Sequence, residues 1–137
     1  MCRQGASVTQ TAVLEQVDDP SLRAYVAWVS VLPRDGRSEA EEARSLVPDT
    51  RASHFWDGEG ILARSFAPVL GLPGGYVAWD VYLVYPAGVR WEREPPSPLY
   101  WHHQLPGVTT APRLDGESFA AHVRLALAKV LEERKND

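Results

Sequence analysis

The chain has one cysteine among its 137 residues, and this scarcity excludes several kinds of protein. A single thiol cannot form an internal disulfide or supply a cysteine-rich zinc site. The thiol belongs to Cys2, which directly follows Met1 and stands at the head of an expected helix. Cys2 is therefore either incidental or the second half of a motif that begins upstream.

Basic runs and long apolar segments are also missing. Asp and Glu total 18 against 14 for Lys and Arg, so a surface that tracks nucleic acid phosphates is not expected. No apolar stretch approaches the roughly 20 residues that cross a bilayer. No basic head followed by an apolar segment marks a secretory signal. We expect a cytoplasmic protein with no nucleic acid or membrane partner, a localisation that would change if the true start lies upstream.

The apolar pattern predicts helices alternating with strands. The expected elements are a helix (3–17), a strand (24–33), a helix (38–47), a short strand (52–57), a helix (60–71), two strands (76–86 and 89–94) and a helix (118–135). The strand at 24–33 is apolar on both faces, as in a buried sheet. Such alternation favours an α/β fold with helices on both faces of a sheet.

Local signals place the boundaries of these elements. Pro86, Ala87 and Gly88 predict the turn of a hairpin between the last two strands. Ser38 followed by Glu41 is a capping-box pattern at the start of the second helix. Asp57 is expected to cap the third helix.

Three stretches resemble the thioredoxin superfamily. They are CRQGA (2–6), FWDGEGILARSFAPVLGL (55–72) and WDVYLVYPAGVRW (79–91). CRQGA is similar to the second half of a Cys-x-x-Cys motif, and the second stretch to the Asp-x-x-Gly and helix passage of peroxiredoxin-like and TlpA-like members. The chain also resembles a bacterial thioredoxin-like group with a Cys-x-x-Cys-Arg opening and later His-Phe-Trp-Asp and Trp-Asp-x-Tyr motifs. The likeness covers roughly residues 2–105.

The resemblance implies a single thioredoxin-like domain over residues 1–137. Its core elements would occupy 1–94, a connection rich in proline and aromatic residues 95–117, and the C-terminal helix 118–135. The implied fold is a central mixed sheet flanked by helices, closed by a β-hairpin and a helix. The first strand and first cysteine of the family are absent, and Trp79 stands where the family has a cis-proline. We therefore expect the true start to lie upstream.

The resemblance also implies a thiol–disulfide redox role. Cys2 would be the surviving, resolving-type thiol, and the helix N-terminus and Arg3 would favour its thiolate. Trp79 and Asp80 would line the catalytic site, while Arg3, Trp56 and Trp101 would bind substrate. The expected partner is a protein or small-molecule thiol or disulfide, with no cofactor, and a homodimer is left open.

Plainer interpretations stay open beside these. Cys2 belongs to an idle terminus, Asp80 bonds a nearby group and Trp79 packs in the core. Imidazole groups at His54, His102 and His103 are of a type that binds metal, but no metal is expected because adjacent histidines on an extended segment point in opposite directions. The alternative function is a non-catalytic binding module that uses the Trp/His-rich segment 95–104 as an exposed surface.

Overall fold

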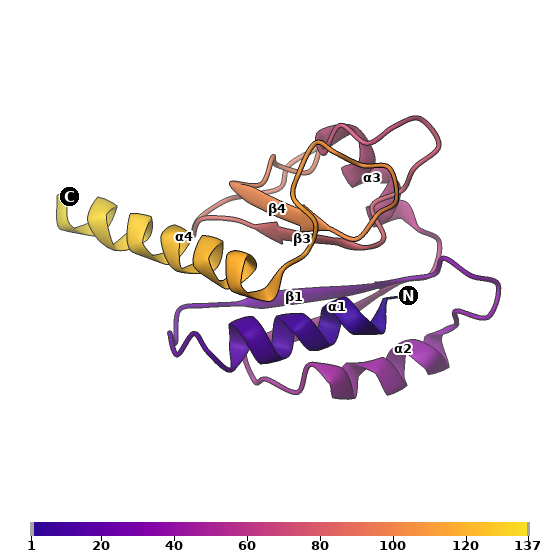
Figure 1. Ribbon diagram of the computed structural model, residues 1–137, viewed down its shortest axis with the longest axis horizontal. Coiled ribbons are helices and arrows are strands. Elements are labelled where there is room, and N and C mark those ends of the chain that lie inside the picture. The colour runs from indigo at the N-terminus through magenta and orange to yellow at the C-terminus, as the bar shows by residue number, and fades with distance from the viewer. Residues whose placement is uncertain (1, 137) are drawn as a thin grey trace.

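The computed structural model describes residues 2–136 and shows helices packed on two small sheets (Figure 1). The chain is thus an α/β protein. Its elements in order are α1 (Arg3–Val8), η1 (Thr9–Leu14), β1 (Ala24–Val29), α2 (Arg37–Ala43), η2 (Arg44–Leu46), β2 (Ala52–Asp57), α3 (Ile61–Val69), β3 (Val81–Val84), β4 (Tyr100–His103) and α4 (Gly116–Asn136). η1 continues α1 as a π-helical segment, and η2 continues α2 as a 3-10 turn.

The first sheet is parallel and consists of β1 and β2. Ala24 pairs with Ala52 and Val29 with Asp57. Alternate side chains of both strands, with Trp28 at their centre, pack against α1, η1 and α2. The run predicted as a strand over 24–33 forms β1 over Ala24–Val29, and its helix-facing side is part of one apolar core. The expectation that both faces are buried is wrong, because Tyr25 on the other face is 73% exposed.

The second sheet is antiparallel and consists of β3 and β4. One face, with Tyr82 and Val84, packs against η1 and α4. The opposite face, with Val81 and Leu83, packs against Phe66 of α3 and its neighbours. This sheet is thus covered on both sides, by α4 and η1 on one and by α3 on the other.

The expected C-terminal hairpin is wrong in its second strand. Segment 89–94 is not a strand, and β3 pairs instead with Tyr100–His103, which lies inside the expected 95–117 connection. The described residues form two sheets of two strands each, rather than one central mixed sheet. The turn at Pro86–Gly88 is a local signal, whereas β4 is held by distant partners. The N–H of His103 donates to the Pro112 carbonyl, and the N–H of Leu114 donates to the His103 carbonyl.

The burial of β4 also corrects the expected Trp/His-rich surface segment. His102 and His103 are 0% exposed, and Trp101 is half-buried. These two histidines are therefore not part of an exposed binding surface in this structure.

The helix starts show one predicted cap and one displaced cap. Asp57 caps α3 as expected, since its two carboxylate oxygens accept the N–H groups of Ile61 and Ala63. The cap of α2 falls two residues earlier than the Ser38 pattern predicts, because Glu39 accepts the N–H of Gly36 at 3.0 Å. Among the described residues, no helix is both long and apolar enough to span a membrane.

Candidate functional site

Cys2 lies at the N-terminal end of α1, in extended backbone directly before the first helical residue. Its side chain is half-buried. The Sγ atom lies 3.8 Å from the side-chain amide nitrogen Nε2 of Gln104, the residue that follows β4. The thiol therefore lies where the start of α1 meets the end of the antiparallel sheet.

Gln104 connects the thiol to a buried acid and a tyrosine. Its Nε2 also lies 3.4 Å from the hydroxyl oxygen of Tyr82, to which it donates. The Tyr82 hydroxyl in turn donates a short hydrogen bond to Oδ1 of Asp80. Asp80 is 4% exposed. We call Cys2, Asp80, Tyr82 and Gln104 the Cys2 cluster.

The backbone of the second sheet builds this cluster. Asp80 lies in the bend directly before β3, and Tyr82 is the second residue of that strand, so the hydrogen bond between their side chains joins the bend to the strand. The N–H of Gln104 donates to the carbonyl of Asp80 at 3.0 Å, which extends the β3–β4 pairing by one step. Asp80, Tyr82 and Gln104 are therefore held by the second sheet, and the thiol comes from the N-terminal end of α1.

The electrostatics of the cluster fix the proton on Tyr82. Burial, followed by the hydrogen bond to Asp80, raises the Tyr82 pKa far above its usual value. The hydroxyl therefore stays protonated and donates to the carboxylate. The side-chain amide of Gln104, with two N–H donors, is left to serve the hydroxyl oxygen and the sulfur.

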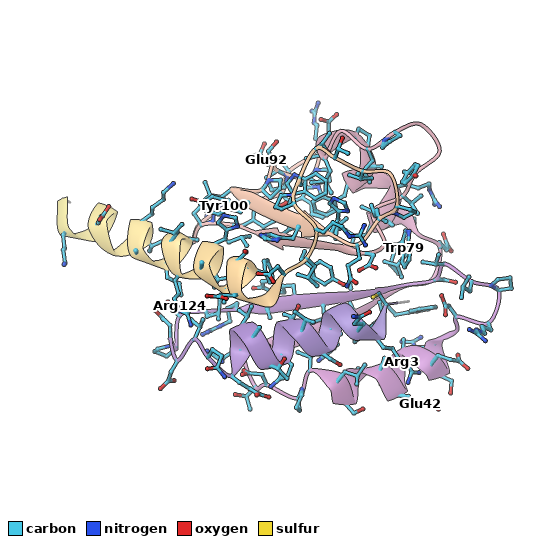
Figure 2. The ribbon with its side chains drawn as sticks, viewed as in Figure 1. Arg3, Glu42, Trp79, Glu92, Tyr100 and Arg124 are labelled. Atoms are coloured by element: carbon cyan, nitrogen blue, oxygen red, sulfur yellow. The ribbon has the colours of Figure 1, made fainter. Side chains whose placement is uncertain are left out.

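Arg3 and Trp79 differ in their relation to this cluster. The Arg3 guanidinium is 3.7 Å from the carboxylate of Glu42 on α2, in an ion pair that is half exposed or more on both sides. Figure 2 shows Arg3 turned toward Glu42 and Trp79 above them at the same end of the molecule. Trp79 is half-buried and directly precedes Asp80. The structure therefore pairs Arg3 with α2 and keeps Trp79 next to the cluster.

Trp56 and Trp101 lie in two different apolar clusters. Trp56 packs with Trp28 and the residues of α1 and α2. Trp101 packs with Phe66 and the residues around α3. Cys2 belongs to neither cluster, so the structure does not gather these two tryptophans around the thiol.

The histidines weighed as metal ligands have other partners. His54 accepts from Nε1 of Trp28 at 3.1 Å through Nδ1, and its Nε2 faces the carbonyl of Val47. His103 bonds the Ala111 carbonyl and the Leu105 N–H. Nε2 of His102 lies 2.8 Å from Nδ1 of His122. Within residues 2–136, no group of three or more His, Cys, Asp or Glu side chains is placed to hold a metal ion.

Sequence reasoning missed Tyr82, Gln104 and Gly5. The Asp-x-Tyr spacing of Asp80 and Tyr82 is a usable signal, because alternate residues of a strand share a face. Gln104 carries no such signal, since its place depends on pairing between distant segments. Gly5 matters because a Cβ there would lie 1.5 Å from the Tyr82 hydroxyl oxygen, so only glycine lets α1 pass the cluster at this distance.

No protein-family model, curated protein or solved structure matches the chain.

Proposed function

We propose that the chain is a thioredoxin-like protein that takes part in thiol–disulfide exchange through Cys2. The supporting observation is the contact between the Cys2 sulfur and the side-chain amide of Gln104. The same amide donates to the Tyr82 hydroxyl, which donates to Asp80. Gln104 and Tyr82 thereby connect the thiol to the side chain of Asp80, which is 4% exposed. The order of helices and strands is compatible with the superfamily and supports the same proposal.

The proposed step is attack by the Cys2 thiolate on one sulfur of a partner disulfide. A new S–S bond forms between Cys2 and that sulfur, and the other sulfur leaves as a thiolate and takes up a proton from water. The products are a mixed disulfide on Cys2 and one free partner thiol. Cys2 is the only cysteine of the given sequence, so the thiol that later resolves the mixed disulfide comes from outside these residues.

The side chains of the cluster have separate roles in this proposal. Gln104 donates an N–H to the sulfur and holds the Cys2 side chain in place beside the sheet. Tyr82 and Asp80 orient Gln104, and neither needs to exchange a proton in the step. Trp79 would border the approach of the partner, while Arg3 is occupied by Glu42 and contributes little.

The test is the rate at which Cys2 forms a mixed disulfide with glutathione disulfide at pH 7.5, followed by mass spectrometry. The reference is a free hexapeptide of sequence MCRQGA. We expect the folded chain to react faster than the peptide by about fivefold or more, because the folded chain holds an N–H donor beside the sulfur that the peptide lacks. Cys2→Ser should form no adduct.

Gln104→Met tests the named donor, since it removes both side-chain N–H groups and leaves the backbone bond to Asp80. It should slow the reaction toward the rate of the peptide. Gln16→Met is the matched control, because Gln16 is exposed on the turn after η1, and its rate should equal that of the unaltered chain. Equal rates of mixed-disulfide formation for the folded chain, the peptide and Gln104→Met would contradict the proposal.

A further inference from the structure

His54 of β2 is bonded at both of its ring nitrogens. Its Nδ1 lies 3.1 Å from the indole Nε1 of Trp28 on the neighbouring strand β1. Its Nε2 lies 3.1 Å from the carbonyl oxygen of Val47, the residue that directly follows η2. One imidazole ring therefore connects the parallel sheet to residues 37–47, which we call the α2–η2 segment.

The partners of the two nitrogens fix the protonation state of His54. An indole Nε1–H is a donor only, so Nδ1 of His54 accepts and carries no proton. The opposite nitrogen faces the Val47 carbonyl oxygen, which is an acceptor only, so Nε2 carries the proton and donates. Only the neutral tautomer with Nε2–H satisfies both bonds at once.

A second proton on His54 would remove the acceptor of the Trp28 indole. An imidazolium carries N–H groups at both nitrogens, so Nδ1–H would face the indole N–H. Trp28 is 4% exposed, and the planes of its ring and the His54 ring differ by only 2°. The indole N–H would then be buried opposite another donor, which is unfavourable. Protonation of His54 and the bond from Trp28 are therefore mutually exclusive.

The helices present apolar side chains to the face of the sheet that carries Trp28. In Figure 1, α1 and α2 lie on the same side of β1, and Ala6, Ala40 and Ala43 pack there. The charged and titratable groups of the elements around His54 are Cys2, Arg3, Glu15, Arg37, Glu39, Glu41, Glu42, Arg44, Asp49, Arg51 and Asp57. In the part of the chain that the structure describes, none of them forms a hydrogen bond or ion pair with His54. A protonated ring thus has no carboxylate partner in place of the indole.

Val47 holds the end of the α2–η2 segment against the sheet. It is 1% exposed and packs in the apolar cluster that contains Ala43 and Trp28. Its N–H donates to the Arg44 carbonyl within η2, and its C=O accepts from His54. η2 is a single 3-10 turn of three residues, a form with poorer hydrogen-bond geometry than an α-helix. A change at His54 therefore acts on a buried residue at the end of a weakly bonded turn.

We propose that His54 is a pH-sensitive switch that couples the α2–η2 segment to the parallel sheet. At pH 8 the neutral ring bonds Trp28 and Val47 and holds the segment in place. Imidazole side chains take up a proton from water between about pH 8 and 5. When Nδ1 of His54 gains this proton, the Trp28 bond breaks, the ring turns away from the indole, and the α2–η2 segment loosens together with Val47. The switch does not involve Cys2, so Cys2→Ser leaves it unchanged.

NMR spectroscopy of the unaltered chain tests the switch without any substitution. At pH 8 the nitrogen shifts of the His54 ring should show an unprotonated Nδ1 and a protonated Nε2. As the pH falls to 5.5, the indole N–H signal of Trp28 should shift along the same titration curve as these ring nitrogens. The indole N–H of Trp91 is the internal control, because Trp91 is exposed and its ring contacts Phe66. The Trp91 signal should stay constant.

Amide hydrogen exchange tests the effect on the α2–η2 segment. From pH 7.5 to 5.5, exchange at Ala43 and Val47, corrected for the intrinsic pH dependence of exchange, should become faster by at least about tenfold. His54→Gln keeps a side-chain N–H donor but does not titrate, so the same change should be less than about threefold. His122→Gln is the matched control, because it replaces a histidine that stacks on Tyr100 of the second sheet. This control should keep the response of the unaltered chain.

Three results would overturn the proposal. A Trp28 indole signal that stays constant while the His54 ring titrates would show that the proton does not act on their bond. A His54 ring that stays neutral until the whole chain unfolds would show that its two bonds fix the ring and do not switch. An equal acceleration of exchange at Ala43 and Val47 in His54→Gln would assign the acid response of the α2–η2 segment to other groups.

Discussion

Gly5 decides how closely α1 approaches the Cys2 cluster. A Cβ at this position would lie 1.5 Å from the hydroxyl oxygen of Tyr82 and 2.3 Å from its ring carbon Cζ. Alanine is the better helix former by about 1 kcal/mol, but overpacking costs about 1–3 kcal/mol and the displaced hydroxyl loses its bond to Asp80, worth about 1.5–3 kcal/mol. Gly5→Ala should therefore lower the free energy of unfolding by about 2 kcal/mol in urea titration.

Gly74→Ala is the matched control for this prediction. A Cβ at Gly74 would meet no atom within 4 Å, and its backbone does not require glycine. Its stability should stay within about 0.5 kcal/mol of the unaltered chain. If Gly5→Ala changes the free energy of unfolding as little as Gly74→Ala does, α1 does not pack closely on Tyr82.

At the scale of elements, Arg51 joins the end of η1 to the start of β2. Its guanidinium donates to the carbonyls of Leu14, Val17 and Asp19 and to both oxygens of Asp49. The carbonyls of Leu14 and Val17 lie at or just after the end of a helical segment, where the last C=O groups lack intrahelical donors. Arg51→Ala should cost about 3 kcal/mol, because several partly buried acceptors lose a charged donor.

Two variants separate this network from a simple loss of charge. Arg51→Lys should rescue little of the stability, since an ammonium group cannot reproduce the planar fork. Arg44→Ala removes an exposed arginine paired with Glu41 at 2.9 Å, and it should change stability by no more than about 0.5 kcal/mol. Full rescue by lysine would contradict the bridging role of Arg51.

The same network predicts a loss of stability in acid. The hydrogen bonds from Arg51 lower the pKa of Asp49 from 3.8 to about 2. Because the folded pKa lies below the unfolded one, the carboxylate stabilises the fold above about pH 4, and this contribution is lost as the pH falls toward 2. Urea midpoints of the unaltered chain and Asp49→Asn should differ at pH 6 and converge near pH 2. A difference that persists at pH 2 would exclude Asp49 as the titrating group.

The sequence predicted elements whose signals are local and failed where distant partners decide. The apolar run that contains Trp28 and the Asp57 cap are local patterns, and both were found. Segment 89–94 also alternates after a turn signal, but Trp91 is 47% exposed, and the segment pairs with no strand in the described chain. β4 is held by partners far along the chain, since it pairs with β3, the N–H of Leu114 donates to the His103 carbonyl, and the His102 ring contacts His122.

The same distinction between local signals and distant partners applies to the candidate site. The resemblance placed Asp80 near Cys2, and the structure connects them through Tyr82 and Gln104. Glu42 forms an ion pair with Arg3 because α2 packs beside α1. No residue spacing in the sequence predicts this contact. Trp56 and Trp101 are aromatic side chains of strands, and their composition does not distinguish a core position from a ligand contact.

At the scale of the whole molecule, a histidine pair connects α4 to the second sheet. Nε2 of buried His102 lies 2.8 Å from Nδ1 of His122, and the His122 ring stacks on Tyr100 with centroids 4.2 Å apart. One nitrogen of the pair must donate and the other accept, so two fully protonated rings would place two N–H groups face to face. The docking of α4 therefore depends on proton occupancy.

This dependence has a definite sign. Burial, more than the nearby His122 charge, lowers the pKa of His102 below 6.5, although the Arg113 carbonyl and Asp115 act in the opposite direction. The unfolded chain thus binds the extra proton first, and stability falls as the pH drops below about 6.5, by at most about 1.4 kcal/mol per pH unit for one group. Urea titrations of the unaltered chain should be flat from pH 8 to 7 and decline toward pH 5.

His102→Phe keeps an aromatic ring against Phe119, which the His102 ring meets edge-on at 5.2 Å, but it removes the titrating group. The variant should show a shallower decline between pH 7 and 5 than the unaltered chain, because its unfolded state gains no proton at this position. Exchange of the α4 amides gives the local readout, since loss of the pair loosens the helix before the parallel sheet unfolds. An unchanged slope in His102→Phe would assign the acid sensitivity to other groups and leave the docking of α4 to its apolar packing, which includes Phe119 and Val123.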